Sequence, residues 1–378
     1  MTRNQVDHQF RILHIILGLT PTNGQYNEHC LPLRKTRDIT ICTYFKSEIT
    51  PPEEITLYDG DSTMRGFFRA LGSSLKERDY DVIHVHTPHA GLLLLVYLFF
   101  SGLYGKLKSS TVHTVQNSYE NFRVSHQIMF LPSFAFFQYL VFCSKSAEES
   151  FPTIFKWLAR GRMQVVQNTV DIDRIDNVIN RIDQDHPSDQ FEIVTVGLIP
   201  MKNPLTMMAA YQNSLNRSGK LIYLGEGKLR PSVENEAKQN GLENQVTLTG
   251  MIARDQVFQH YAQADLFVST SWGEGLPVAV LEAMACRSPV LLSDIPPHRE
   301  IAEDMEFIPL IKPDDVDGFA REIKRFHEMS RQERNDIGQK CREIIEEKFT
   351  ISTMHNAYAK IYSQITGSQI STLLTAAN

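Results

Sequence analysis

The sequence predicts an α/β protein with two domains, each built on a doubly wound parallel β-sheet. The chain has 378 residues, which is enough for two domains of ordinary size, each with its own core. Residues 265–292 read as a strand, a glycine-containing turn, a helix that starts near Pro277 and a second strand. Apolar runs at 11–17 and 191–197, each followed by a loop, indicate the first strand of each domain.

The charge distribution argues against a nucleic-acid partner. The protein has 38 Lys and Arg against 44 Asp and Glu, a formal net charge of −6, and it contains no basic blocks. Residues 1–180 hold 18 basic and 17 acidic residues, which leaves +1 on this part and −7 on the rest. A nearly neutral N-terminal half would allow approach to an anionic membrane surface.

The cysteines and the N-terminal segment predict a cytoplasmic protein. Five cysteines lie far apart, without C-x-x-C or Cys/His spacing, as expected of reduced thiols. Residues 1–19 contain a short apolar run and no small-residue cleavage site. We therefore interpret them as a tail and a first strand rather than a signal peptide.

Residues 265–300 carry the strongest chemical signal. A helix that follows a parallel strand places free amides and partial positive charge at the carboxyl edge of the sheet, where a diphosphate binds. Glu274 in the turn and Glu282 in the helix would repel an anion there, so we expect both to accept hydrogen bonds from sugar and ribose hydroxyl groups. The residues alone equally allow Glu274 as a helix cap and Glu282 as a solvated carboxylate.

The same segment resembles a known signature. It reads E-G-L-P-V-A-V-L-E-A-M-A-C and then S-D-I-P-P-H-R-E, similar to the E-x7-E signature of family-4 glycosyltransferases. These are retaining enzymes of the GT-B fold, so the resemblance implies two Rossmann-like domains facing across a cleft. It also implies that Glu274 contacts the donor sugar and Glu282 the nucleotide ribose. Amides near Gly275 and Leu276 would stabilise the leaving diphosphate.

Three more segments of the C-terminal half resemble this family. Gly197 and Lys202 match V-G-R-L-x-P-x-K, in which Arg and Lys hold the donor diphosphate, but the arginine is missing. A lysine cannot replace the bidentate geometry of a guanidinium, and Lys202 alone could also be a solvated residue at a helix start. Gly227 lies in a run similar to the G-x-G-P-L loop beside the nucleotide, and Met251 follows the glycine after which backbone groups meet the base.

The N-terminal half departs from the family in three places. Gly24 stands where the family carries a Gly-Gly pair that lets the backbone approach the donor, although Asn-Gly is equally typical of a plain turn. Gln116 replaces the histidine of T-x-H, and an amide can bond a sugar hydroxyl but cannot become a cation. Thr169 replaces the glycine of I-P-N-G-V-D. Ser144, after the last strand of this half, is expected to cap the next helix.

We predict no metal site. His84 and His86 share one face of a strand, but no third ligand follows them, so a structural role is favoured. Two D-x-D triplets occur, at 59–61 and 171–173. The first reads as a turn in which its last aspartate or the next serine caps the helix over residues 64–75. Hard cations need several converging oxygens, which neither triplet supplies.

Two apolar segments leave a choice open. Residues 91–100 are too few to cross a bilayer, which takes about 20 residues. Residues 129–142 are equally apolar but are interrupted by Pro132. Both segments could be buried core helices, or they could form a surface that faces a lipid monolayer and admits a lipid-linked acceptor.

The resemblance implies an acceptor-side domain at 1–175 and a nucleotide-sugar-binding domain at 176–350. Residues 351–378 would form a helix that crosses back to the N-terminal domain, followed by a tail. The predicted activity is metal-independent, retaining hexosyl transfer without a cofactor, with Glu274 and Lys202 as catalytic residues. The predicted partners are a UDP- or GDP-linked donor and a glycan or lipid-linked acceptor. The expected location is cytoplasmic, or peripheral at the inner face of the membrane.

Two other interpretations remain open from the sequence. The missing arginine, Gln116, Thr169 and the altered glycine loop fit a binding or partner protein of the same fold that has lost turnover. A non-hydrolysing sugar-nucleotide epimerase also has this fold but lacks the E-x7-E arrangement.

Overall fold

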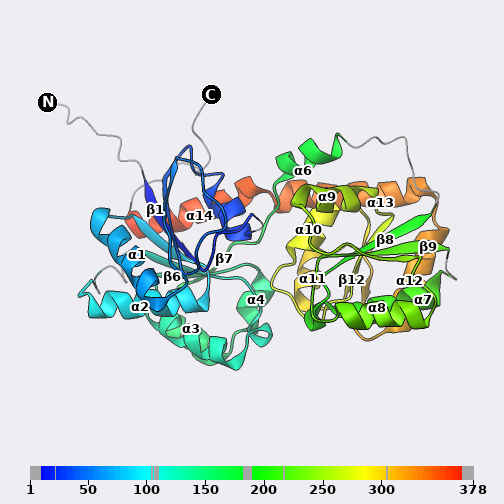
Figure 1. Cartoon of the computed structure of the whole chain (residues 1–378), viewed down its shortest axis with the longest axis horizontal. Coiled ribbons are helices and arrows are strands. Elements are labelled where there is room, and N and C mark those ends of the chain that lie inside the picture. The colour runs from blue at the N-terminus through cyan, green and yellow to red at the C-terminus, as the bar shows by residue number, and fades with distance from the viewer. Residues whose placement is uncertain are drawn as a thin grey trace. The chain divides into compact units, whose positions relative to one another are not determined.

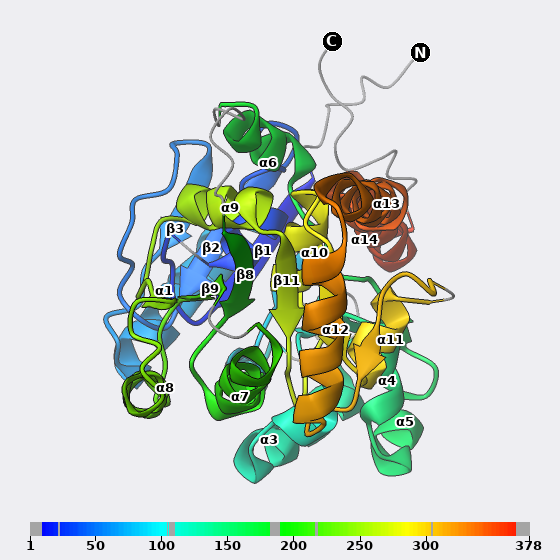
Figure 2. The same cartoon turned by 90° about the vertical axis from the view of Figure 1, so that its right-hand side faces the viewer.

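The chain packs into two compact units, which the computed structural model describes over residues 10–21, 23–103, 105, 110–181, 190–215, 218–303 and 305–367 (Figures 1 and 2). Unit 1 comprises residues 1–167 and 352–378, and unit 2 comprises residues 168–351. The domain boundaries expected at 175/176 and 350/351 remain predictions. Residues 1–9, 182–189 and 368–378, which include parts of the tails predicted at the two ends, lie outside the described residues.

Unit 1 is built on a seven-stranded sheet in which every pair of neighbours is parallel. In spatial order its strands are β3 (Ile55–Tyr58), β2 (Asp38–Thr43), β1 (Arg11–Ile16), β4 (Val82–Val85), β5 (Thr111–Val115), β6 (Tyr139–Phe142) and β7 (Met163–Val165). The order 3-2-1-4-5-6 is that of a dinucleotide-binding fold, and the apolar strands are almost fully buried because helices cover both faces.

Helices lie on both faces of this sheet. The helical segments of unit 1 are η1 (a π-helix, Gln25–Cys30), α1 (Met64–Glu77), α2 (Pro88–Phe100), η3 (a 3-10 turn, Tyr119–Asn121), α3 (Val124–Phe136), α4 (Lys145–Ser150), α5 (Thr153–Ala159) and α14 (Ile351–Thr366). The α14 helix packs on the face formed by β1, β2 and β4, beside η1, where it completes the core of unit 1. A chain segment from the C-terminal end is therefore an integral part of this unit.

Local capping corrects one expectation and confirms another. The side chain of Thr63, not of Asp61 or Ser62, caps α1 by accepting a hydrogen bond from the amide of Gly66. Asp61 instead accepts hydrogen bonds from Thr63. Ser144 caps α4 as predicted, with its hydroxyl 2.9 Å from the amide nitrogen of Ala147.

The two apolar segments are not simply buried. The second one is not a single helix, since α3 ends at Phe136 and the remainder forms β6. Phe100 at the end of α2 is 83% exposed, and Val124 at the start of α3 is 69% exposed. The interpretation as fully buried core helices is therefore wrong for the outer faces of α2 and α3. Within the described part of the chain, no helix is long and apolar enough to cross a membrane.

Unit 2 repeats the same architecture with a six-stranded parallel sheet. In spatial order its strands are β10 (Val246–Leu248), β9 (Gly219–Leu224), β8 (Phe191–Val196), β11 (Leu266–Ser269), β12 (Val290–Ser293) and β13 (Leu310–Ile311). Its helical segments are α6 (Ile172–Ile179), η4 (a 3-10 turn, Pro200–Lys202), α7 (Pro204–Ser214), α8 (Arg230–Gln239), α9 (Arg254–Gln263), α10 (Val278–Ala285), α11 (Pro296–Ile301), α12 (Val316–Glu328) and α13 (Arg331–Lys348). Helices α7 and α12 cover one face of the sheet, and α9, α10 and α13 cover the other (Figures 1 and 2). The predicted pair of doubly wound parallel-sheet domains is confirmed.

Candidate functional site

Four loops of unit 2 meet at the carboxyl edge of its sheet. They follow β10, β9, β8 and β11, which are consecutive neighbours in the sheet. The β9 and β10 loops are joined by a hydrogen bond from the Gly225 amide to the Gly250 carbonyl, 3.1 Å long. The β11 and β8 loops are joined by one from the Trp272 amide to the Met201 carbonyl, 2.9 Å long. In an open parallel sheet this edge is where ligands bind.

Glu274 lies in the loop after β11 and is held by two side chains. Its Oε1 atom is 2.6 Å from Lys202 Nζ and accepts a hydrogen bond of 2.7 Å from Ser271 Oγ. Glu274 is 8% exposed, so the ion pair is partly shielded from water. No side-chain hydrogen bond caps the N-terminus of α10 at Pro277, and an effect of the Glu274 charge on the helix dipole stays a prediction.

Lys202 ends the short η4 turn after β8, where Gly197 is needed to place it. Gly197 has φ of +86°, and a Cβ atom at this position would lie 3.0 Å from Lys202 Cγ. Any other residue would therefore be strained and would push the lysine side chain. Asn203, which has φ of 54°, anchors the turn by donating to the carbonyls of Thr270 and Pro313. Lys202 is not the solvated helix-start residue that the sequence also allowed.

Gly227 brings the β9 loop against the β8 loop. A Cβ atom there would collide with the carbonyl oxygen of Leu198, so only glycine allows this approach. The amide of Leu229 donates to the same carbonyl at 2.8 Å. Met251, just after the β10 loop, is 71% exposed. The predicted donor-side residues of unit 2 thus lie on adjoining loops.

Gly275 and Leu276 lead from Glu274 into α10. The carbonyl of Leu276 accepts a hydrogen bond of 3.0 Å from Asn168 Nδ2. Pro277 occupies the N-cap position, so α10 starts at Val278, one residue later than predicted. The first turn of α10 contains no acidic residue, so its partial positive charge is not neutralised by its own side chains. A small pocket beside this helix start is lined by Lys202 and Ser271, among others.

Glu282 is buried inside α10 and is paired with an arginine. It is 5% exposed, and its carboxylate forms an ion pair with Arg254 on α9. Burial raises the pKa of Glu282 to about 6, although the guanidinium groups of Arg254 and Arg174 favour its ionised form. The interpretation of Glu282 as a solvated carboxylate is therefore wrong.

His298 contacts this site indirectly and was not predicted from the sequence. Its Nδ1 atom is 2.8 Å from the Ser293 carbonyl and 3.1 Å from the Ser293 hydroxyl. Ser293 Oγ in turn donates to the carbonyl of Ser271, the residue that holds Glu274. Burial lowers the pKa of His298 to about 4, so it is a neutral positioning residue. His298 was visible in the S-D-I-P-P-H-R-E run, but nothing in that run shows its contact with the β11 loop.

The three candidates of the N-terminal half are less defined, and of these Gly24 and Gln116 lie in unit 1 whereas Thr169 lies at the start of unit 2. Gly24 caps η1 with φ of −62° and ψ of −42°, a conformation open to any residue, so the alternative of a plain Asn-Gly turn is wrong. Gln116 follows β5 and is half-buried. Thr169 is fully buried. The roles of Gly24 and Gln116 toward a substrate remain predictions.

The D-x-D triplets have structural roles. Asp59 accepts hydrogen bonds from the hydroxyl of Thr43 and the amide of Ser47. Asp171 caps α6 through the amide of Arg174. Carboxylates used in this way satisfy local donors rather than converging on a cation.

Most of the chain matches two families of sugar-transferring enzymes. Residues 177–344 match the family "Glycosyl transferases group 1", and residues 39–174 match "Glycosyltransferase Family 4". A galactosyltransferase of Escherichia coli, named UDP-Gal:alpha-D-GlcNAc-diphosphoundecaprenol alpha-1,3-galactosyltransferase, is 25% identical over 298 residues, which cover 75% of each chain.

Two other similar proteins match very different shares of this chain. The putative teichuronic acid biosynthesis glycosyltransferase TuaC of Bacillus subtilis is 29% identical over 140 residues, which cover 37% of this chain and 34% of TuaC. The solved structure of Anabaena Alr3699/HepE in complex with UDP-glucose covers 94% of this chain and 100% of its own, with a TM-score of 0.74 and 18% identity. At that identity the structural match shows the fold alone.

Proposed function

Because the chain belongs to the family-4 glycosyltransferases and has their GT-B fold, we propose that it is a retaining hexosyltransferase that uses a UDP- or GDP-linked sugar. The observation that carries the proposal is the Lys202–Glu274 pair at the carboxyl edge of the unit 2 sheet. The buried Glu282 follows in α10, eight residues after Glu274. These groups offer a cation, a hydrogen-bond acceptor for a sugar and an acceptor for a ribose.

Lys202 and the start of α10 would stabilise the leaving group. The main barrier in glycosyl transfer is the departure of a diphosphate from an oxocarbenium-like carbon. A preorganised cation and helix amides lower this barrier, because they need no reorganisation when charge develops on the diphosphate oxygens. Lys202 is already oriented by Glu274 at 2.6 Å. With these groups in place the transfer would not require a metal ion.

Glu274 would orient the sugar. Its Oε1 atom binds Lys202 and Ser271, which fixes the carboxylate plane. A carboxylate has about four lone-pair positions, so it can accept a further hydrogen bond from a hydroxyl group of the donor sugar. We assign it no role as a nucleophile. The leaving diphosphate would help to deprotonate the acceptor on the same face of the sugar, which retains the anomeric configuration.

We propose that Glu282, Gly227 and Met251 contact the nucleoside. Glu282 would accept hydrogen bonds from the ribose in its ionised form, which Arg254 stabilises. The glycine loop and the backbone after β10 would contact the base. Since main-chain groups rather than side chains would bind the base, the choice between UDP and GDP needs measurement.

The acceptor would be a glycan or a lipid-linked sugar of the cell envelope. The Escherichia coli relative is named for a sugar diphosphoundecaprenol substrate. In unit 1, helices α2, α3 and α5 pack on one another and expose apolar side chains. These side chains, which we call the apolar helix face, are Val96, Phe99, Phe100, Val124, Ile128, Phe136, Ile154 and Trp157.

The charges around the apolar helix face suit an anionic lipid surface. The three helices contain no Asp or Glu. The exposed basic residues Arg123, Lys156 and Arg160 lie in or beside them and outnumber the nearby exposed Glu120 and Glu149. Apolar side chains with flanking cations are typical of proteins that lie on a membrane. We therefore propose peripheral binding at the cytoplasmic face of the membrane.

A thermal-shift panel of UDP-, GDP- and ADP-sugars tests the donor proposal. The preferred donor should raise the midpoint of unfolding, because it binds only the folded protein. Transfer to a lipid-diphosphate acceptor should then occur at equal rates with and without added Mg²⁺ or Mn²⁺. Binding without transfer or donor hydrolysis would instead identify a partner protein that has lost turnover.

Vesicle sedimentation tests the membrane proposal separately. The protein should bind vesicles that contain phosphatidylglycerol more than vesicles of phosphatidylcholine alone. The double variant Phe100→Ser/Trp157→Ser should lose this binding, whereas Leu205→Ser, which changes an exposed apolar residue of unit 2, should keep it. Equal binding by the double variant would exclude this face.

A further inference from the structure

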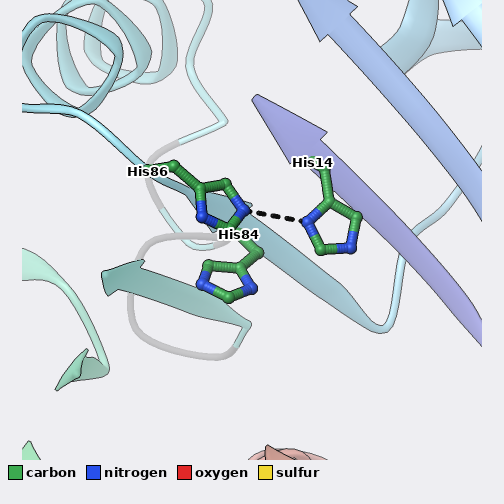
Figure 3. Close-up of side chains that lie close together, drawn as sticks. All are labelled: His14, His84 and His86. Carbon is green, nitrogen blue, oxygen red and sulfur yellow. Dashed lines mark hydrogen bonds between the residues drawn. The ribbon is translucent and has the colours of Figure 1, made fainter. Parts of the chain in front are cut away.

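Three buried histidines of unit 1 meet at the junction of β1 and β4. His14 on β1 stands opposite His84 on β4 in the parallel register, and His86 is two residues beyond His84 on the same side of the sheet. Figure 3 shows the three rings turned toward one another. The sequence offered only His84 and His86, and β1 brings in the third imidazole. All three are at most 2% exposed.

The hydrogen bonds of this cluster are incomplete. His14 Nδ1 lies 3.0 Å from His86 Nε2, so one of these two nitrogens carries a proton and donates it to the other in a hydrogen bond. His14 Nε2 and His86 Nδ1 are buried, and no hydrogen-bond partner for them exists among the described residues. Either choice of tautomers therefore leaves one N–H and one lone pair unsatisfied. A buried polar group without a partner calls for an explanation, and a bound ion is one that would satisfy both nitrogens.

We propose that His14, His84 and His86 bind one zinc ion. One ring nitrogen from each histidine lies within 4.8 Å of those from the other two. Zinc bonds to imidazole at about 2.0–2.1 Å, which separates tetrahedral nitrogen ligands by about 3.3 Å. Binding would therefore require the rings to rotate so that these nitrogens approach one another. None of the three residues belongs to the proposed donor site in unit 2.

The surroundings of His84 suit a metal ligand. His84 Nδ1 is 2.8 Å from the hydroxyl of Tyr362 on α14. A hydrogen bond from the second ring nitrogen is the usual way in which a ligating histidine is oriented. His84 Nε2, now 2.6 Å from Thr114 Oγ1, would turn to the ion. Thr114 would keep its contact of 2.9 Å with the hydroxyl of Tyr358.

The donor set favours zinc over calcium or magnesium. The three candidate ligands are all imidazole nitrogens, one from each histidine. Imidazole suits zinc and related transition metals, whereas calcium and magnesium select oxygen ligands.

A fourth ligand would complete the coordination. His29 on η1 is also buried, and its ring centroid is 5.0 Å from that of His86. Water or hydroxide is the other possible ligand, and hydroxide would offset part of the ionic charge. The ion would then tie β1 to β4 beneath η1 and α14, which is a structural role.

Metal analysis of the full-length protein tests the proposal. After treatment with a chelator and incubation with Zn²⁺, gel filtration should recover about one zinc per chain, and Zn²⁺ should raise the midpoint of thermal unfolding. Co²⁺ should give the intense visible bands of a tetrahedral complex with nitrogen ligands. His14→Gln/His86→Gln should reduce zinc uptake at least tenfold. His113→Gln, which changes a buried histidine on the opposite face of the sheet, should bind zinc as the wild type does.

The contrary outcomes are equally definite. Wild-type protein that is folded yet takes up less than about a tenth of an equivalent of zinc would overturn the proposal, as would a double variant with unchanged uptake. Circular dichroism establishes whether the double variant folds. If it does not, the wild-type Co²⁺ spectrum decides, because weak octahedral bands would contradict three buried imidazole ligands.

Discussion

Replacing Lys202 by methionine should separate two roles of this lysine. Lys202 Nζ is 2.6 Å from Glu274 Oε1, and the two side chains are 21% and 10% exposed. Removing one preorganised donor to developing charge lowers kcat by about 10²–10³-fold. The same change leaves the buried Glu274 carboxylate with Ser271 but without its cation. The free energy of unfolding should therefore fall by about 1–3 kcal/mol.

The double variant Lys202→Met/Glu274→Gln distinguishes lost catalysis from lost stability. It removes both charges, so no unpaired carboxylate stays buried, and the free energy of unfolding should return to within about 1 kcal/mol of the wild type. Transfer should not recover, because the cation that faces the diphosphate is still missing.

Two measurements suffice for this comparison. Urea unfolding gives the stability of each variant, and release of the nucleoside diphosphate in the presence of acceptor gives kcat with the donor chosen by thermal shift. Lys220→Met is a matched control, because Lys220 also pairs with a glutamate, Glu192, at 3.3 Å and lies outside the site. If the double variant transferred sugar as fast as the wild type, Lys202 would act only by balancing the charge of Glu274.

Three further changes probe the residues around this pair. Gly197→Ala should destabilise unit 2 by about 1–2 kcal/mol, because Gly197 has φ of +86°. It should also lower kcat by displacing Lys202, and an unchanged kcat would show that the loop adapts. His298→Phe should lower kcat about tenfold by loosening the support of Glu274, with little change in donor affinity measured by calorimetry. Burial raises the pKa of Glu282 from 4.5 to about 6, so protonation below about pH 6 should weaken its pairing with Arg254 and the binding of donor. The same raised pKa means that ionisation of Glu282 costs stability as the pH rises through about 6, and Glu282→Gln should show neither inflection.

The strands and the donor-side residues could be predicted from the sequence because their signals are local. An apolar run followed by a glycine loop gives a buried strand and its exit, and this pattern located the strands that precede Lys202, Gly227 and Met251. The E-x7-E spacing placed Glu274 before α10 and Glu282 within it. All of these features depend on residues fewer than ten positions apart.

Contacts between distant segments could not be predicted. No local pattern indicates that Arg254 pairs with Glu282, 28 residues away, or that His298 supports Glu274 through two serines. The third histidine beside His84 is 70 positions away and becomes a neighbour only through the order of the strands. Likewise, the exposed side of α2 cannot be found from periodicity, because nearly all of its residues are apolar.

The position of α14 has a consequence for protein synthesis. Unit 2 is a continuous stretch of chain, whereas unit 1 needs residues 352–366 to complete its core. Domains usually fold in the order in which they leave the ribosome. Here the N-terminal part emerges first but cannot bury Val82, Ile39 and their neighbours against Tyr358 until residues 352–366 have been synthesised. Unit 2 can therefore reach its native state first, and a chain truncated before α14 would leave the apolar face of the first sheet uncovered.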